Sequence, residues 1–279
     1  MADRNFREML EKQWADGKFV CVGLDSDYNK IPESAIKPTV YETILKFNVA
    51  IIQATADLVC AYKPNIAFYA GQGLDGIKAL IATITYIMQY APRVPVILDA
   101  KVGDIENTNK GYVRFVFGVL KADAVTVYPY LGKTAMQPFL DEKDKGIIVI
   151  CKTSNKDSDE FQNLQINGVP LYKIVAKHIA ARWNENNNCA VVVGATYPAE
   201  LQEVRGIVND MPILIPGIGK QGGDLEKTVQ VGASGLGTGM MINSSRGIIF
   251  ASQKPDFAQT ARQETGKLHN AINKLRKGV

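Results

Sequence analysis

Eight short apolar runs alternate with longer segments of helical periodicity along the 279 residues, and this alternation constrains the fold more than any other feature. A short run that is apolar throughout is typical of a strand buried on both faces of a parallel sheet. The predicted strands occupy residues 19–24, 61–66, 94–98, 124–128, 146–151, 189–193, 212–215 and 239–242. The segments between them are long enough for crossovers between parallel strands. The pattern predicts a (β/α)8 barrel, with a doubly wound open sheet as the alternative.

Composition is that of an ordinary globular protein, with 46% hydrophobic and 22% charged residues. No linker or short repeat divides the chain, so we expect a single domain over residues 1–279. The net charge of +4 is partly concentrated near the C-terminus and does not favour nucleic acid as a partner. We find neither the apolar core of a signal peptide nor a run of about 20 apolar residues. We therefore expect a soluble cytoplasmic protein with no membrane partner.

The four cysteines support the same compartment. Cys21, Cys60, Cys151 and Cys189 form no CxxC pair, and three of them lie in or beside apolar runs. This placement predicts buried, reduced thiols, as is usual in the cytosol.

Polar and charged residues gather directly after the predicted strands, which is where a barrel builds its active site. They are Asp25, Lys63, Asp99, Lys101, Thr153, Ser154, Gly219, Gln221 and Arg246. The longest connection, residues 152–168, is polar and is predicted to be irregular, and loops of that length are usually functional or disordered.

The segment LDAKVGD places two carboxylates and an ammonium at one strand-to-helix turn. Asp99 and Lys101 are two residues apart, so their side chains point to the same side of an extended strand. Asp104 comes close to the start of the next predicted helix, and Lys63 lies on a neighbouring predicted strand, residues 61–66. Flanking carboxylates favour the charged form of a lysine, which makes Lys101 a proton donor rather than a Schiff-base nucleophile. A purely structural ion-pair network is the alternative.

Other familiar catalytic motifs are absent. The only histidines, His178 and His269, fall on predicted helices far from any strand end. The sequence has no GxSxG elbow, P-loop, CxxC zinc pair or HExxH motif. Lysines and carboxylates must therefore supply the chemistry.

The segments PGIGKQGGD and NSSRG predict a phosphate site between the last two loops of the barrel. Glycines allow backbone amides to approach an anion, and we expect the helix after Gly223 to offer its N-terminus. Arg246, just past the eighth predicted strand, would supply the positive charge.

The segment LDAKVGDIENT resembles the signature of the orotidine 5'-phosphate decarboxylase family, Asp-x-Lys-x-x-Asp-Ile-x-x-Thr. Asp99, Lys101, Asp104, Ile105 and Thr108 stand in register with it. The similarity continues through LDSD, AYKPNIAFY, KTSN, PGIGKQGG and NSSRG, so it covers nearly the whole chain, and the KTSN and NSSRG forms resemble the longer branch of the family. Val102 departs from the Arg that many members of that branch have, and we expect altered packing or a changed interface rather than lost activity.

The resemblance implies a homodimeric barrel with active sites at the subunit interface, which decarboxylates orotidine monophosphate to UMP without a metal or other cofactor. By this similarity, Lys101 would protonate C6 of the pyrimidine as carbon dioxide leaves. Asp99 would crowd the substrate carboxylate, together with Asp104 of the partner subunit. The implied substrate-binding residues are Lys63 and Asp25 for the ribose, Ile105 and Thr108 across the dimer, Ser154 for the pyrimidine edge, and Gln221 and Arg246 for the phosphate, under a loop that begins near Pro216.

Two other functions remain open from the sequence. A related barrel decarboxylase or aldolase acting on sugar phosphates shares the Asp-x-Lys-x-x-Asp pattern but adds an acidic metal ligand. Lys63, Pro64 and Asn65 after the second strand supply no such ligand, which argues against this class. The other alternative is a catalytically silent nucleotide-binding barrel.

Overall fold

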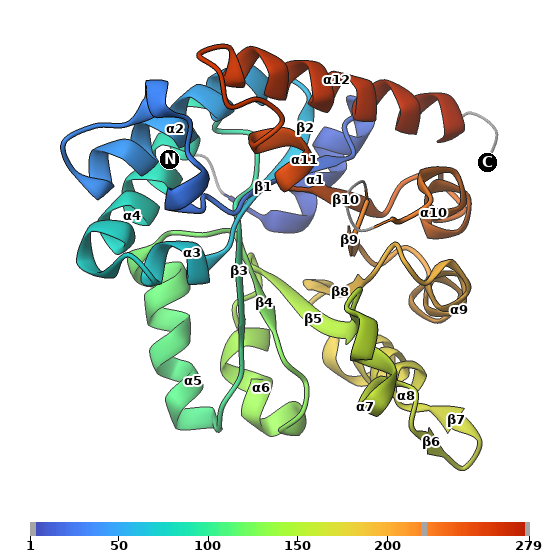
Figure 1. The fold of residues 1–279 in the computed structure, drawn as a ribbon. Coiled ribbons are helices and arrows are strands. Elements are labelled where there is room, and N and C mark those ends of the chain that lie inside the picture. The colour runs from blue at the N-terminus through green and yellow to red at the C-terminus, as the bar shows by residue number, and fades with distance from the viewer. Residues whose placement is uncertain (1–3, 219–221, 277–279) are drawn as a thin grey trace.

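The computed structural model describes residues 4–218 and 222–276 and forms a closed (β/α)8 barrel (Figure 1). Eight parallel strands follow the order β2-β1-β10-β9-β8-β5-β4-β3 around the ring. Parallel bridges between Tyr62 and Val96 and between Asn65 and Asp99 close the ring from β2 to β3. The predicted barrel is confirmed, and the open sheet is wrong. The strands are β1 (Val20–Leu24), β2 (Val59–Pro64), β3 (Ile97–Val102), β4 (Ala124–Val127), β5 (Gly146–Lys152), β8 (Cys189–Val193), β9 (Ile213–Pro216) and β10 (Met240–Ser244).

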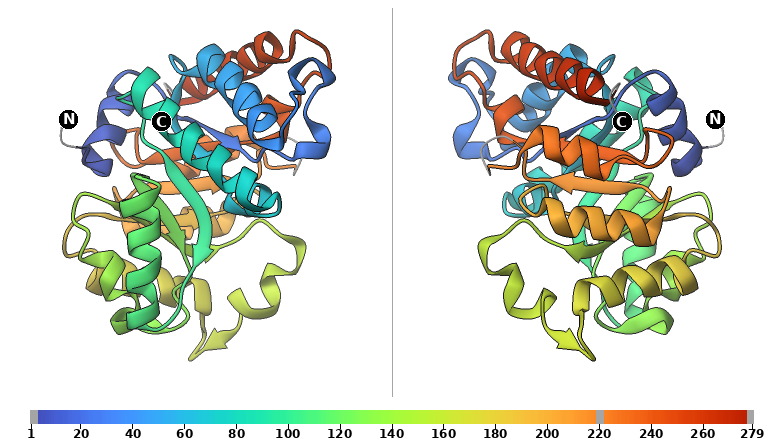
Figure 2. Two further views of the ribbon diagram at one scale, coloured as in Figure 1. Left: turned by 90° about the vertical axis from the view of Figure 1, so that its left-hand side faces the viewer. Right: turned by 90° about the vertical axis from the view of Figure 1, so that its right-hand side faces the viewer.

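Helices form an outer layer around the strands (Figure 2). The principal ones are α1 (Phe6–Ala15), α2 (Val40–Thr55), α3 (Ile66–Ala70), α4 (Gly73–Tyr90), α5 (Glu106–Val113), α6 (Gly132–Leu140), α8 (Leu171–His178), α9 (Pro198–Val208), α10 (Leu225–Gly232), α11 (Arg246–Ile249) and α12 (Phe257–Arg276). Turns of π-helix extend α5 over Arg114–Val119 and α8 over Ile179–Trp183. Within residues 4–218 and 222–276, no helix has the length and apolar character needed to cross a membrane.

The strands are buried because both of their faces are covered, one by the barrel interior and one by the helices. Every residue of β1, β2, β4, β5, β8 and β10 is buried. In β3 the last three residues are only half-buried, and the strand extends four residues beyond the predicted end at 98. Asp99 and Lys101 therefore belong to the strand itself and lie at its carboxyl end.

Helix α1 closes the amino end of the barrel. The Phe6 ring lies so close to Gly146, at the start of β5, that a Cβ there would come within 2.2 Å of a ring carbon. The Trp14 indole donates to the carbonyl of Met240, at the start of β10, at 2.9 Å. Because this end is sealed, the opposite end is the one available for a site.

The connection over residues 152–168 is more ordered than predicted. It contains a 3-10 turn (Lys156–Ser158), α7 (Asp159–Gln162) and β6 (Gln165–Ile166), which pairs with β7 (Val169–Pro170) in a two-stranded hairpin. The polar composition hid these elements because their residues are mostly exposed and show no apolar period.

All four cysteines are buried and free, as predicted. Burial raises the pKa of the Cys21 thiol to about 12, which keeps it protonated near neutral pH.

Val102 is half-buried against the core and pairs with Val127 of β4, in keeping with a role in packing.

Candidate active site

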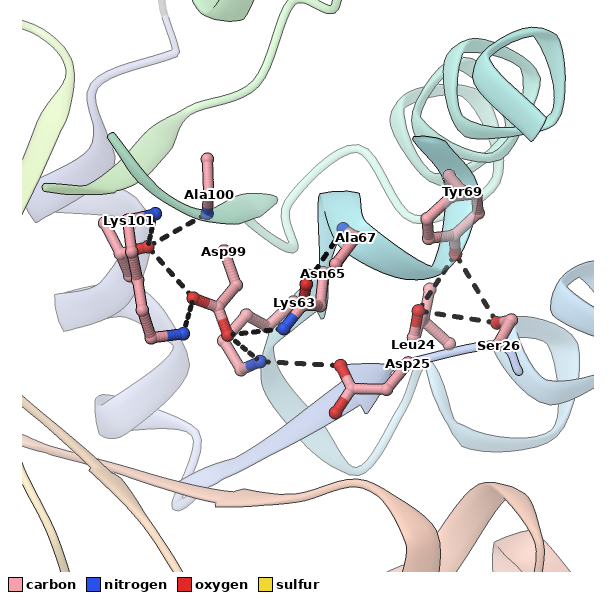
Figure 3. Close-up of polar contacts among 11 residues, drawn as sticks. Leu24, Asp25, Ser26, Lys63, Asn65, Ala67, Tyr69, Asp99, Ala100 and Lys101 are labelled. Atoms are coloured by element: carbon pink, nitrogen blue, oxygen red, sulfur yellow. Dashed lines mark hydrogen bonds and ion pairs between the residues drawn. The ribbon is translucent and has the colours of Figure 1, made fainter. Parts of the chain in front are cut away.

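Lys63 and two aspartates form a buried ion-pair network at the carboxyl end of the barrel (Figure 3). Lys63 Nζ donates to Asp99 Oδ2 at 2.9 Å and lies 3.6 Å from Asp25 Oδ1. Burial by itself lowers the pKa of Lys63, but the charges of Asp25 and Asp99 outweigh it and hold that pKa above its usual value. Lys63 therefore stays charged and is suited to binding polar groups rather than to nucleophilic attack.

Asp99 lies at the centre of the network between two lysines. Its Oδ1 accepts from Lys101 Nζ at 2.5 Å, while its Oδ2 accepts from Lys63 and, at 3.3 Å, from Asn65 Nδ2. Burial raises the pKa of Asp99, but Lys63 and Lys101 together reverse that effect and hold the pKa well below its ordinary value. A permanent negative charge is thereby placed beside the Lys101 ammonium.

Lys101 has a left-handed backbone conformation, with φ at 47°. The ladder between β3 and β4 is irregular here, and the side chain of Thr126 in β4 replaces the missing backbone partners. Thr126 Oγ1 accepts the amides of Ala100 at 3.0 Å and Lys101 at 2.9 Å and donates to Asp99 Oδ1 at 3.0 Å. Such strain costs about 1–3 kcal/mol and is typical of functional sites.

A cavity of about 420 Å³ opens above this network. Of the predicted site residues it is lined by Asp25, Lys63, Asp99, Lys101, Ser154, Pro216 and Arg246, and also by Thr153. The structure thus brings most of the predicted residues to one cavity. Gln221 and Gly219 lie outside the described residues.

Three predicted residues at the start of α5 do not line this cavity. Asp104 caps the chain locally, since its Oδ1 accepts the amide of Ile105 at 2.6 Å. Ile105 is 60% exposed, and Thr108 is also exposed. None of the three is among the residues that line the cavity.

The structure bears on two of the residues behind the phosphate prediction, Arg246 and the start of the helix after Gly223. Arg246 begins α11 and lines the cavity together with Gly217 and Gly247, and among residues 4–218 and 222–276 it makes no ion pair. The helix after Gly223, however, does not offer a free N-terminus. Asp224 caps α10, accepting the amide of Lys227 at 3.1 Å, so a carboxylate already occupies that end.

A family model for the orotidine 5'-phosphate decarboxylase / HUMPS family matches residues 18–262. The chain belongs to this family. It is 48% identical over 271 residues to orotidine 5'-phosphate decarboxylase of Janthinobacterium sp. (strain Marseille), covering 96% of this chain and 98% of that protein.

Solved structures agree with the family assignment. Leishmania donovani OMP decarboxylase superimposes with a TM-score of 0.83 at 34% identity, over 97% of this chain and 99% of its own. Leishmania donovani UMP synthase superimposes with a TM-score of 0.84 at 36% identity, over 96% of this chain but only 56% of its own length.

Sequence reasoning missed several lining residues of this decarboxylase-family barrel. Thr126, Tyr128 and Gln162 were missed altogether, whereas Asn155, Asn243, Ser244 and Ser245 were covered only as members of the segments KTSN and NSSRG. Thr126 carried a usable signal, because it is the one polar residue in the buried run AVTV. Gln162 carried none, since it reaches the cavity only through the folding of the connection after β5.

Proposed function

We propose that this chain decarboxylates orotidine 5'-monophosphate to UMP, a carbon–carbon lyase reaction of pyrimidine biosynthesis. The observation that carries the proposal is the Asp25–Lys63–Asp99–Lys101 network beneath one cavity, with Arg246 on the same cavity wall. Relatives of this name that align with nearly the full chain support it.

In this proposal the bond between C6 of the pyrimidine and its carboxylate breaks, and its electron pair remains on C6 as carbon dioxide leaves. Lys101 then transfers a proton from Nζ to C6, and solvent restores that proton. Asp99 places a fixed negative charge near the substrate carboxylate, while Lys101 stabilises the charge that develops on C6.

The remaining cavity residues would hold the nucleotide. Lys63 and Asp25 are assigned to the ribose hydroxyls and Ser154 to the pyrimidine edge. Arg246 and Gln221 are assigned to the phosphate, under a loop that begins near Pro216. Binding energy from the remote phosphate can then be used to orient the reacting end of the substrate.

We further propose that the chain acts as one barrel domain and forms a homodimer that completes each cavity. Asp104, Ile105 and Thr108 would reach the neighbouring subunit's cavity, which fits the exposure of Ile105 and Thr108 and the absence of all three from the lining of their own cavity. Tyr130, before α6, is 92% exposed, and Leu131 next to it is 46% exposed. Exposed apolar side chains beside α5 are the kind of surface that a second subunit would cover.

The test follows the absorbance of orotidine monophosphate with purified protein in the presence of a chelator. We expect conversion to UMP that the chelator does not affect. Strict metal dependence, or turnover only of sugar phosphates, would favour a metal-dependent member of the same family. Tight binding of UMP without turnover would favour a catalytically silent barrel.

A further inference from the structure

Lys152, the last residue of β5, carries a buried ammonium that the proposed reaction does not use. Its side chain is 0% exposed and is not among the groups that line the cavity. Nζ donates to Asp159 Oδ1 at 2.7 Å, to Ser158 Oγ at 3.0 Å and to Asn163 Oδ1 at 3.1 Å. The ring centroid of Tyr197 lies 4.4 Å from the same nitrogen. One ammonium thus binds three side chains of a single loop.

The loop that Lys152 holds, residues 153–163, also forms one wall of the cavity. Thr153, Ser154, Asn155 and Gln162 line that wall. Gln162 is fixed in both directions, since its Oε1 accepts the Thr153 amide at 2.9 Å and its Nε2 donates to Thr153 Oγ1 at 2.8 Å. The Tyr197 hydroxyl donates to the Asn155 carbonyl at 3.2 Å. The residues that bind Lys152 (Ser158, Asp159 and Asn163) and the residues that line the cavity therefore belong to the same segment, 153–163.

A buried ammonium is a costly way to stabilise a fold. Taking such a charge out of water costs several kcal/mol, which is recovered only when the partners are well placed. Asp159 is the one carboxylate that pairs with Lys152 in the described chain, and its side chain is 57% exposed. The ammonium fixes the conformation of the loop, because three side chains of the loop bind to the same nitrogen atom.

We propose that Lys152 is a positioning residue for nucleobase recognition. By fixing the loop from behind, it holds Ser154 and Gln162 at the base end of the cavity while leaving the phosphate end, at Arg246, untouched. The inference rests on the proposed function, in which Ser154 meets the pyrimidine edge.

The experiment compares Lys152→Met with a matched control, Lys177→Met, which removes an exposed lysine of α8. Dissociation constants are measured by calorimetry for UMP and for ribose 5-phosphate, which keeps the sugar and phosphate but lacks the base. Loss of well-formed polar contacts to the base should weaken UMP binding about tenfold or more in Lys152→Met. Ribose 5-phosphate affinity should stay unchanged, and Lys177→Met should bind both ligands normally.

Hydrogen exchange supplies a second readout, since amides of residues 153–163 should exchange faster in Lys152→Met while those around Arg246 do not. If Lys152→Met fails to fold, Asp159→Asn removes the charged partner from an exposed position and should show the same selective loss of UMP affinity. Equal weakening of both ligands, or normal UMP binding, would overturn the inference. If the wild-type protein turns over orotidine monophosphate and the variants bind UMP normally, the inference about Lys152 is overturned and the proposed function stands. If the wild-type protein binds no UMP, both proposals are overturned.

Discussion

The backbone amide of Lys101 donates to Thr126 Oγ1 at 2.9 Å while Lys101 itself holds φ at 47°. The same hydroxyl donates its proton to Asp99 Oδ1 at 3.0 Å. One buried threonine therefore fixes both the strained residue assigned to proton transfer and the carboxylate beside it. Without this hydroxyl, the amides of Ala100 and Lys101 would lose the side-chain acceptor that they share.

Replacing Thr126 with Val should test this arrangement, because Val keeps the shape but removes all three hydrogen bonds. Misplacing Lys101 by a fraction of an ångström to an ångström should lower kcat for orotidine monophosphate by on the order of 10²-fold. Thr126→Ser, which keeps the hydroxyl, should recover most of the activity. Steady-state kinetics of the two variants decide the matter, and equal activity in both would remove Thr126 from the mechanism.

Lys101→Ala should abolish turnover and leave nucleotide binding. Loss of a positioned general acid costs about 10²- to 10⁴-fold in rate, and loss of its charge beside C6 adds to that. UMP affinity, measured by calorimetry, should change far less because Lys63, Ser154 and Arg246 remain. A near-normal rate would show that another group delivers the proton.

The sequence was sufficient to predict the barrel and most of the cavity. Apolar runs define buried parallel strands, and the charges at their carboxyl ends converge because a closed barrel brings those ends together. This is why Asp25, Lys63, Asp99 and Lys101, which lie far apart in the sequence, were predicted as one group and lie around one cavity.

Other features depend on local geometry that the pattern does not encode. The role of Thr126 arises from an irregular strand pairing and a left-handed lysine, neither of which leaves a periodic trace. The contacts of Lys152 exist only once the connection after β5 has folded. The sequence did carry a signal against a free helix N-terminus after Gly223, because Asp224 is of a residue type that commonly caps helices.

Arg246→Ala should weaken recognition of the phosphate specifically. A charge-assisted hydrogen bond contributes about 1.5–3 kcal/mol, or roughly ten- to a hundredfold in affinity for UMP. Uridine, which lacks the phosphate, should bind the variant and the wild type equally. If the variant loses uridine affinity to the same extent, Arg246 serves the fold or the base rather than the phosphate.

The lowered pKa of Asp99 should appear in the pH dependence of stability. The carboxyl binds protons less readily in the folded protein than in the unfolded chain, where its pKa is about 3.9. The contribution of Asp99 to the free energy of unfolding is therefore fully present above about pH 4 and is lost as the pH falls through the lower pKa of the folded state. Asp99→Asn should unfold at lower urea concentration near neutral pH, and the gap from wild type should narrow below about pH 4. Asp157→Asn, at an exposed position, should run parallel to wild type, and a constant gap for Asp99→Asn would contradict the assigned shift.

Mixing two inactive variants should test whether the sites are shared between subunits. If Asp104 serves the neighbouring cavity, a dimer of Lys101→Ala with Asp104→Ala has one site with both substitutions and one site with neither. Random exchange at equal concentrations should then restore about a quarter of wild-type activity, since half of the dimers are mixed and each has one intact site. Subunit exchange is verified separately by native mass spectrometry of tagged and untagged chains. Confirmed exchange without recovery would mean that Asp104 acts within its own subunit, because a shared site would leave one intact site in every mixed dimer.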